Sequence, residues 1–429
     1  MHTHKTPTKL PTTQRGAATL VVTLALLFAM LLVVVYVNRN LVSEQRSAAN
    51  QARSTQAFEA AEAGLEWAQA QLNGRGRIGA DCRPSSDAAA TSFRVRLLNH
   101  NPATATFAPA TWLQGSLPVV RQAACVRGAA GWSCSCPVSG APAPVAAAGS
   151  APAPAFLIEF QGTGQPGLVR LLSTGCNRLG GDCVPGGATP ADATAHVEVA
   201  LGLVPGLKTS PAAALTARGS IAAGAAAIGA HHGDPATGGI ALHAGGTIDA
   251  AAARITGPAG SVADEALVAN DTALAGLDTS AFFVSYFGMR PDDWGQQSVV
   301  TTLRCAGPCG DALRNAIEPG IVNALIHIDG DMALDGPLVL GTPQRPVVIV
   351  VDGGAQLRGT VTVHGVLYSR TLRWDATDGA DALVRGAALT EGSYSGTGTP
   401  DFVYDSELLA RLKGNTGSFA RVNGSWRDF

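Results

Sequence analysis

Hydrophobic residues follow three successive patterns along this chain: one unbroken apolar run, one helical stripe, and many short alternating segments. The run from Ala17 to Val37 contains no charged residue. Because an α-helix rises ~1.5 Å per residue and about 20 apolar residues cross a bilayer, this run predicts one transmembrane helix. A cleaved signal peptide fits less well, since its apolar core is usually ~7–15 residues long and is followed by small residues, not by Asn38-Arg39.

The helix is expected to continue beyond the membrane as far as Asn73. Its apolar residues there recur at spacings of three and four: Phe58, Ala61, Leu65, Ala68 and Leu72. This spacing places them on one face, which we interpret as a helix assembly face in need of a partner surface. Asn73-Gly74 is a natural helix stop. Glu59 and Glu62 lie one turn apart beside this stripe, and we interpret them as part of a solvated face.

Alternating residues between positions 74 and 211 predict a small antiparallel sheet. The expected strands are Ser92 to Leu98, Val119 to Arg121, Phe156 to Phe160, Leu168 to Leu172 and His196 to Ala200. Such a sheet could pack on the helix stripe and bury both apolar faces. Residues 137–155 are nearly all Pro, Ala, Gly and Ser, and we expect a linker or exposed loop within this head.

Residues 212–404 consist of short apolar segments separated by Gly, Ala and Asp. This recurrence favours a right-handed parallel β-helix, although short alternating strands also allow a β-sandwich. A helical insertion at 280–320, with helices at Ser280 to Met289 and Asp311 to Ile317, is expected to cover an open solenoid edge. Residues 405–429 are predicted to form a closing helix and a loosely held tail.

The fold class predicted from these patterns is α+β. It combines a long N-terminal transmembrane helix and its extension, an antiparallel β-sheet head, and a parallel β-helix-like all-β domain. The predicted order is 1–16 leader or cytoplasmic segment, 17–73 helix, 74–211 head, 212–404 β-helix-like domain and 405–429 terminal helix and tail.

Eight cysteines follow the apolar run. Two pairs enclose short turn-forming loops suited to local disulfides, namely Cys176 with Cys183 and Cys305 with Cys309. The pairing of the other four stays open: Cys82, Cys125, Cys134 and Cys136. Disulfides require an oxidising compartment, so we expect the C-terminal region to lie in the periplasm, although the basic residues flanking the helix are nearly balanced in number.

Composition argues against several functional classes. Charged residues make up 14% of the chain and the formal net charge is −2, so nucleic acid is not expected as a partner. Asp329-Gly330-Asp331 and His231-His232 are the metal candidates, but a turn and a surface loop are favoured because further ligands are missing at the usual spacings. We therefore expect no metal, no cofactor and no enzymatic activity.

Two segments resemble those of the PilX-type minor pilins, also called type IV pilus assembly proteins. One is Gln14 to Val22, and the other is Phe58-Glu59-Ala60-Ala61-Glu62-Ala63-Gly64-Leu65. The resemblance covers about residues 14–72. It implies that prepilin peptidase cuts between Gly16 and Ala17, and that the partners are the lipid bilayer, other pilins and the inner-membrane pilus assembly machinery. Major pilins carry Glu five residues after the cut, whereas Val21 stands here.

The sequence thus predicts a non-enzymatic minor pilin-like subunit that takes part in type IV pilus assembly or initiation. It is expected at the inner membrane, with a surface pilus as a second location left open. Two alternatives stay open: a membrane-anchored surface adhesin or binding module built on the β-helix, and a type II secretion pseudopilin. A polysaccharide-acting enzyme rests on fold analogy alone, without a carboxylate cluster in the sequence.

Overall fold

The computed structural model describes residues 15–146, 153–185, 190–223, 228–251, 254–317, 324–376 and 382–428. The chain divides into two compact units, Met1–Gln56 and Ala57–Phe429. Helix α1 (Arg15–Asn73) contributes residues to both units. The predicted leader lies outside the described residues up to position 14, and the Pro/Ala-rich loop does so at positions 147–152.

In the first unit, α1 is long and apolar enough to cross a membrane. Its most apolar window has a mean hydropathy of 3.0, and none of that window is buried within the chain. Within the uncharged stretch, Leu27 and Phe28 are 59% and 64% exposed. This stretch therefore has no protein partner in the described part of this unit. Such a surface is stable in lipid rather than in water.

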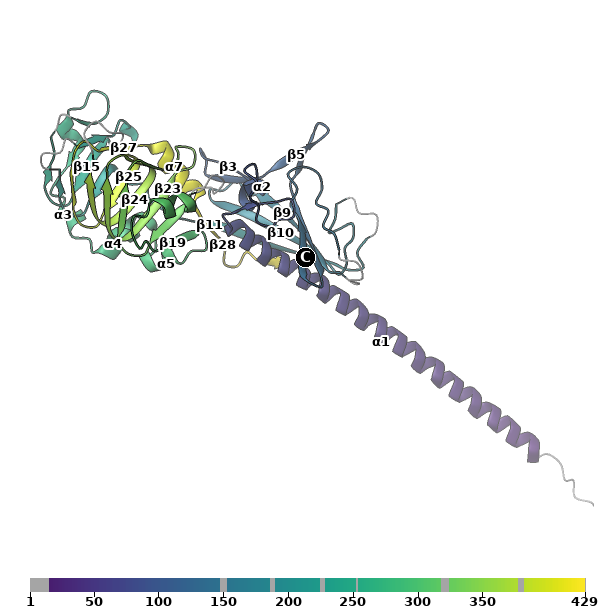
Figure 1. The fold of residues 1–429 in the computed structure, drawn as a ribbon. Helices are drawn as coiled ribbons and strands as arrows, with labels where there is room; N and C mark the ends of the chain where they lie inside the picture. Colours follow the sequence, from purple (N-terminus) through teal and green to yellow (C-terminus); the bar gives the residue numbers. More distant parts are fainter. Residues whose placement is uncertain are drawn as a thin grey trace, which may run out of the picture. The chain divides into compact units, whose positions relative to one another are not determined.

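The second unit begins with the remainder of α1 and an antiparallel head sheet (Figure 1). The strand order is β28-β11-β10-β9-β7-β8, with β29 also paired to β11. Its strands are β7 (Ala123–Gly128), β8 (Gly131–Ser135), β9 (Ala155–Gly162), β10 (Leu168–Cys176), β11 (Thr194–Pro205), β28 (Gly417–Arg421) and β29 (Arg427–Asp428). The three strands predicted from Phe156, Leu168 and His196 are thereby confirmed.

Small elements flank this sheet. They are β1 (Arg77–Ile78), β2 (Thr91–Ser92), α2 (Phe93–Leu97), β3 (Leu98–Asn101), β4 (Thr106–Pro109), β5 (Thr111–Gln114) and β6 (Leu117–Val120). The expected strand near Val119 is β6, which pairs only with β5 in a separate hairpin.

The predicted strand from Ser92 to Leu98 is wrong, because residues 93–97 form helix α2. Ser92 caps this helix by accepting a hydrogen bond from Val95 N. The alternation of apolar residues with arginine misled the interpretation, since Arg96 is only 4% exposed. Its guanidinium points inward and donates to the carbonyl oxygens of Gly79 and Cys136, each at 2.7 Å. The arginine at this position therefore does not indicate a side of the segment that faces solvent.

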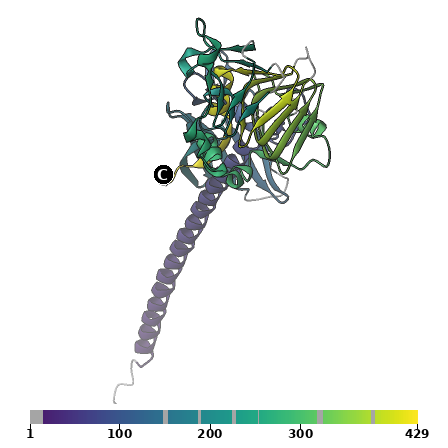
Figure 2. The same ribbon diagram turned by 90° about the vertical axis from the view of Figure 1, so that its left-hand side faces the viewer.

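The larger sheet of the second unit is a curled parallel sheet, and all of its described pairings are parallel (Figure 2). This confirms the β-helix-like interpretation and removes the sandwich alternative. Its strands are β12 (Ala213–Ala217), β13 (Ile221–Ala222), β14 (Gly229–His231), β15 (Ile240–Ala244), β16 (Ile248–Asp249), β17 (Ile255–Thr256), β18 (Leu267–Val268), β19 (Val300–Leu303), β20 (Leu325–Ile328), β21 (Met332–Asp335), β22 (Leu338–Leu340), β23 (Val347–Arg358), β24 (Val361–Asp375), β25 (Leu383–Thr390), β26 (Tyr394–Thr397) and β27 (Asp401–Tyr404).

The strands of this sheet do not stack in sequence order. Along one face the pairing runs β19-β20-β23-β24-β25-β12-β15-β18. Strand β25, near the end of this sheet's sequence, thus pairs with β12, which is its first strand. The chain therefore enters and leaves this row of paired strands at neighbouring positions in the middle of the row.

Those neighbouring ends connect directly to the head. Pro205 of β11 pairs with Gly417 of β28, and Gly206 N donates to Thr416 O at 2.9 Å. Residues 207–415, which we call the insert, therefore lie between two adjacent strands of the head sheet. The sequence placed the tail after the β-helix-like domain, whereas the structure returns it to the head.

A helical segment joins β18 to β19 and packs on the outside of the insert. It contains α3 (Thr272–Ala275), α4 (Thr279–Phe287) and α5 (Pro291–Gly295). Helix α6 (Gly310–Ala316) follows β19, so both predicted helices are present, with a strand between them that was not predicted. Phe283 contacts Tyr368 edge-on at 5.0 Å between ring centroids. Helix α4 thus covers a sheet face, not the solenoid edge that was expected.

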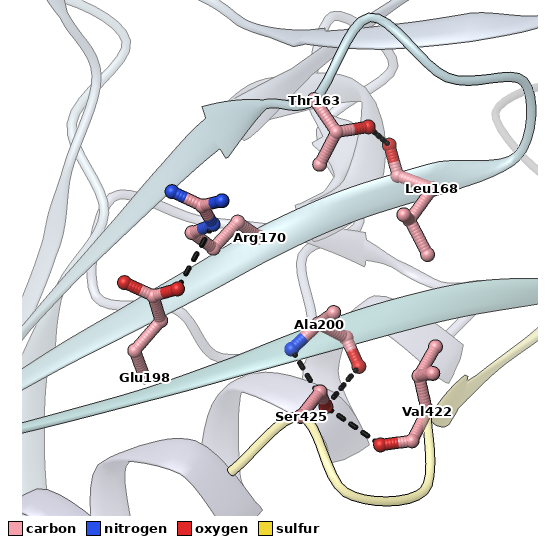
Figure 3. A network of polar contacts seen from close by, with 7 residues as sticks. All are labelled: Thr163, Leu168, Arg170, Glu198, Ala200, Val422 and Ser425. Atoms are coloured by element: carbon pink, nitrogen blue, oxygen red, sulfur yellow. Dashed lines mark hydrogen bonds and ion pairs between the residues drawn. The ribbon is translucent and has the colours of Figure 1, made fainter. Parts of the chain in front are cut away.

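The C-terminal tail is held against the head sheet (Figure 3). After α7 (Ser406–Asn415), β28 pairs with β11. Ser425 Oγ donates to Val422 O at 2.6 Å and accepts from Ala200 N at 3.1 Å. The expectation of a loosely held tail is therefore wrong, because its backbone groups are used by the sheet.

Four disulfides join all eight cysteines. Cys176 bonds to Cys183 and Cys305 to Cys309, which are the two short loops singled out in the sequence. The other two bonds are Cys82–Cys136 and Cys125–Cys134. The second of these links directly paired residues of β7 and β8, a cross-strand placement that cysteine spacing alone could not identify.

Candidate assembly segment

The assembly segment, defined here as residues 15–73, coincides with α1. Gly16 and Ala17 lie in its first turn, and the residues before Arg15 lie outside the described part of the chain. Val21 is 64% exposed. An apolar side chain at this position keeps the start of the helix free of a carboxylate that lipid would not solvate.

The predicted assembly face is covered by the chain's own head sheet. Ala61, Leu65 and Ala68 are each 0% exposed, and Leu72 is 1% exposed. They share one core with β-strand residues of the head. The stripe therefore fixes this part of α1 to its own head, which confirms the expected packing of the head sheet on the stripe. Its interpretation as a helix assembly face needs correction, because within the described residues the stripe is not free to receive another subunit.

Close packing explains the small residues of the motif. A Cβ on Gly64 would collide with the Ser173 hydroxyl and lie 3.0 Å from the Phe156 ring. On the opposite side of the contact, a Cβ on Gly175 of β10 would collide with the backbone of Ala57 and lie 2.9 Å from Ala61 Cα. Helix and strand approach so closely because glycine faces the other element on each side.

The C-terminal tail contacts side chains in the same part of α1. Trp426 packs edge-on against Phe58, with ring centroids 6.3 Å apart, and its Nε1 donates to Glu62 at 2.7 Å. Arg421 forms an ion pair with Glu66 at 2.7 Å. Glu62 thus accepts a hydrogen bond from the tail, which corrects its interpretation as part of a solvated face. Glu59 is exposed, as that interpretation expected.

Asn73, predicted only as a helix stop, also binds the tail. Its Oδ1 accepts from Phe419 N at 2.7 Å, and its Nδ2 donates to Phe419 O at 3.0 Å. The side-chain amide thereby imitates a β-bridge to β28. The last residue of α1 is in this way linked to a strand almost at the end of the chain.

Arg94 joins the ends of two helices. Its guanidinium donates to Leu72 O at 3.2 Å, to Asn415 O at 3.2 Å and to Gly417 O at 2.8 Å. Leu72 lies in the last turn of α1 and Asn415 is the last residue of α7, so both carbonyls belong to negative helix ends. Burial lowers the pKa of Arg94 to about 10, so it remains charged at neutral pH.

The metal candidates are engaged in other contacts. Asp329 pairs with Arg304 at 2.6 Å, and Asp331 accepts from Gly354 N at 2.8 Å. His231 contacts Thr256 at 2.8 Å, and His232 stacks on Tyr404 at 3.8 Å between ring centroids. Among the residues that the structure describes, no group of three or more His, Cys, Asp or Glu side chains is arranged to hold a metal.

Comparison with known families identifies the class of this segment. Residues 15–66 match the family model described as PilX N-terminal. The match includes both Gly16-Ala17 and the motif from Phe58 to Leu65, and it confirms the resemblance stated from the sequence. In this segment the chain is similar to type IV minor pilins, and α1 supports a single-pass membrane anchor.

One solved structure that is similar is the competence-associated pilin ComZ from Thermus thermophilus, with 13% identity, covering 88% of this chain and 97% of that chain. The TM-score of 0.21 is too low to carry an argument. A search of curated proteins found no match.

Sequence reasoning missed Gly175 and the residues of the tail. A glycine inside a strand such as β10 is a signal of close backbone approach, and it could have been used. Asn73, Arg421 and Trp426 carried no comparable signal, because their partners lie more than 340 positions away in the sequence.

Proposed function

We propose that this chain is a non-enzymatic minor pilin-like subunit that takes part in the assembly or initiation of type IV pili. The observation that carries the proposal is the PilX N-terminal match over residues 15–66. In this proposal, prepilin peptidase cuts between Gly16 and Ala17, and the new N-terminus joins other pilins and the inner-membrane assembly machinery.

The contacts of the head support a role as a carrier. Ala61 and Leu65 of the motif pack on the chain's own sheet, and Glu62 binds its tail. The insert leaves the head between adjacent strands, so a head of this kind can carry it without interruption of the sheet. Four disulfides favour a C-terminal region exported to the periplasm.

Deletion of the gene, followed by complementation, tests this proposal. We expect fewer surface fibres without the chain, restoration by the full chain, and far fewer copies of it than of the main subunit in sheared fibres. An unchanged number of fibres would contradict an assembly role. Loss of surface attachment with normal fibres would instead favour the adhesin, and loss of secretion with normal pili would favour the pseudopilin.

A further inference from the structure

A cleft of about 420 Å³ lies where α4 and α5 cross the outside of the insert. Its walls are residues of α4, α5, β23 and β24, together with Glu391, which follows β25. Phe283 and Phe287 pack against Tyr368 and hold α4 to the sheet beside the cleft. This volume falls within the range of small-molecule sites in proteins.

The most buried charged group in the cleft is the Glu391 carboxylate, whose side chain is 13% exposed. Its Oε1 accepts from the Tyr368 hydroxyl at 2.7 Å, and its Oε2 lies 3.9 Å from Arg370 Nε. Burial raises the pKa of the Tyr368 hydroxyl well above its usual value, so that it stays a donor. Glu391 is therefore compensated and oriented by the chain itself.

The other charged groups are similarly arranged. Asp352 accepts at one oxygen from His327 Nε2 at 2.9 Å and is 40% exposed. Arg370 is 67% exposed, and Asp292 is exposed at the start of α5. Because the carboxylates of Glu391 and Asp352 already have partners within the chain, the cleft does not require a cationic ligand. It offers single acceptor oxygens, guanidinium protons and the hydroxyl of Ser280, whereas the lining residues Val350 and Val351 are only 2% and 1% exposed.

We propose that this cleft binds a neutral saccharide. Sugar hydroxyls both donate and accept, which matches a lining that mixes carboxylate acceptors with guanidinium and hydroxyl donors. The proposal concerns binding only. It does not depend on the pilus role, because the insert would bind sugar in any membrane-anchored chain.

The test uses the full chain in phospholipid nanodiscs, so that no glycoside detergent competes. The probe is an array of defined neutral oligosaccharides, with spermidine as a cationic probe, followed by titration calorimetry on the tightest sugar. We expect Arg370→Ala and Glu391→Gln each to weaken binding about tenfold or more, since each removes a charged hydrogen-bonding partner. Asp292→Asn should weaken binding as well, since it removes a carboxylate that lines the cleft. Asp293→Asn is its matched control, because both residues are exposed in the first turn of α5 and only Asp292 lines the cleft.

Loss of binding in the cleft variants, with Asp293→Asn unchanged and with unaltered thermal midpoints, would support the proposal. Failure of every neutral saccharide to bind would overturn it. So would sugar binding that survives both Arg370→Ala and Glu391→Gln. Binding of spermidine alone would overturn the proposed ligand class.

Discussion

Gly175 of β10 lies so close to Ala61 of α1 that a Cβ on the glycine would be 2.9 Å from the Ala61 Cα. This contact joins α1 to the head sheet at a point of close approach. A helix with larger residues at the motif positions could not reach this strand.

Gly175→Ala is therefore expected to destabilise the head by about 1–3 kcal/mol, because the added methyl must push helix and strand apart. Thermal unfolding of the purified full chain would measure this. Gly202→Ala in the neighbouring strand is the matched control, since its Cβ would meet only ordinary contacts, at 3.5 Å from Val422 and 4.0 Å from Leu168. Equal effects of both changes would contradict the account.

Asn73→Ala should release β28 from the helix, because the backbone groups of Phe419 lose both side-chain hydrogen bonds. The expected cost is about 1–3 kcal/mol. Hydrogen exchange at residues 417–421 should become faster than in the wild type. Asn423→Ala, in an exposed turn, serves as the control. Unchanged protection of β28 in the Asn73 variant would refute the clamp.

Arg94→Lys is predicted to destabilise the second unit although it preserves charge. One ammonium cannot reproduce the planar set of hydrogen bonds to Leu72, Asn415 and Gly417. Each buried carbonyl left unpaired costs about 1–3 kcal/mol. The same change at exposed Arg127 should leave the thermal midpoint unaltered, and a midpoint equally unaffected by Arg94→Lys would count against the role of Arg94.

The insert is expected to be removable. Replacing residues 207–415 with Asn-Gly would join Gly206 to Thr416, which already pair, by a two-residue hairpin loop. The remaining head should keep its three disulfides, Cys82–Cys136, Cys125–Cys134 and Cys176–Cys183. Disulfide mapping and circular dichroism would check this. A head that forms scrambled disulfides would show that it depends on the insert.

The sequence predicted the elements more successfully than their long-range order. Strong periodicity identified α1, the central head strands and the parallel texture of the insert. The return of β28 to β11 could not be predicted, because nothing local in Gly417–Arg421 specifies a partner about 215 positions earlier. The pairing of β25 with β12 was missed for the same reason.

Burial of charged side chains caused the main local error. Arg94 and Arg96 were interpreted as the outward residues of a strand, whereas their guanidiniums bind backbone carbonyls inside the unit. In the assembly segment, the apolar stripe was correctly located on one helix face, and the head sheet that was expected to pack on it does so. Periodicity alone identifies a face that must be covered, and it could not show that the head leaves no room there for another subunit.

Mass spectrometry of the chain's N-terminus, in cells with and without prepilin peptidase, tests the central claim most directly. The account predicts a mature chain that begins at Ala17, depends on the peptidase and is present in sheared fibres. A chain that keeps residues before Gly16 in both strains and stays in the membrane would contradict it, leaving a static anchor for the head and its insert.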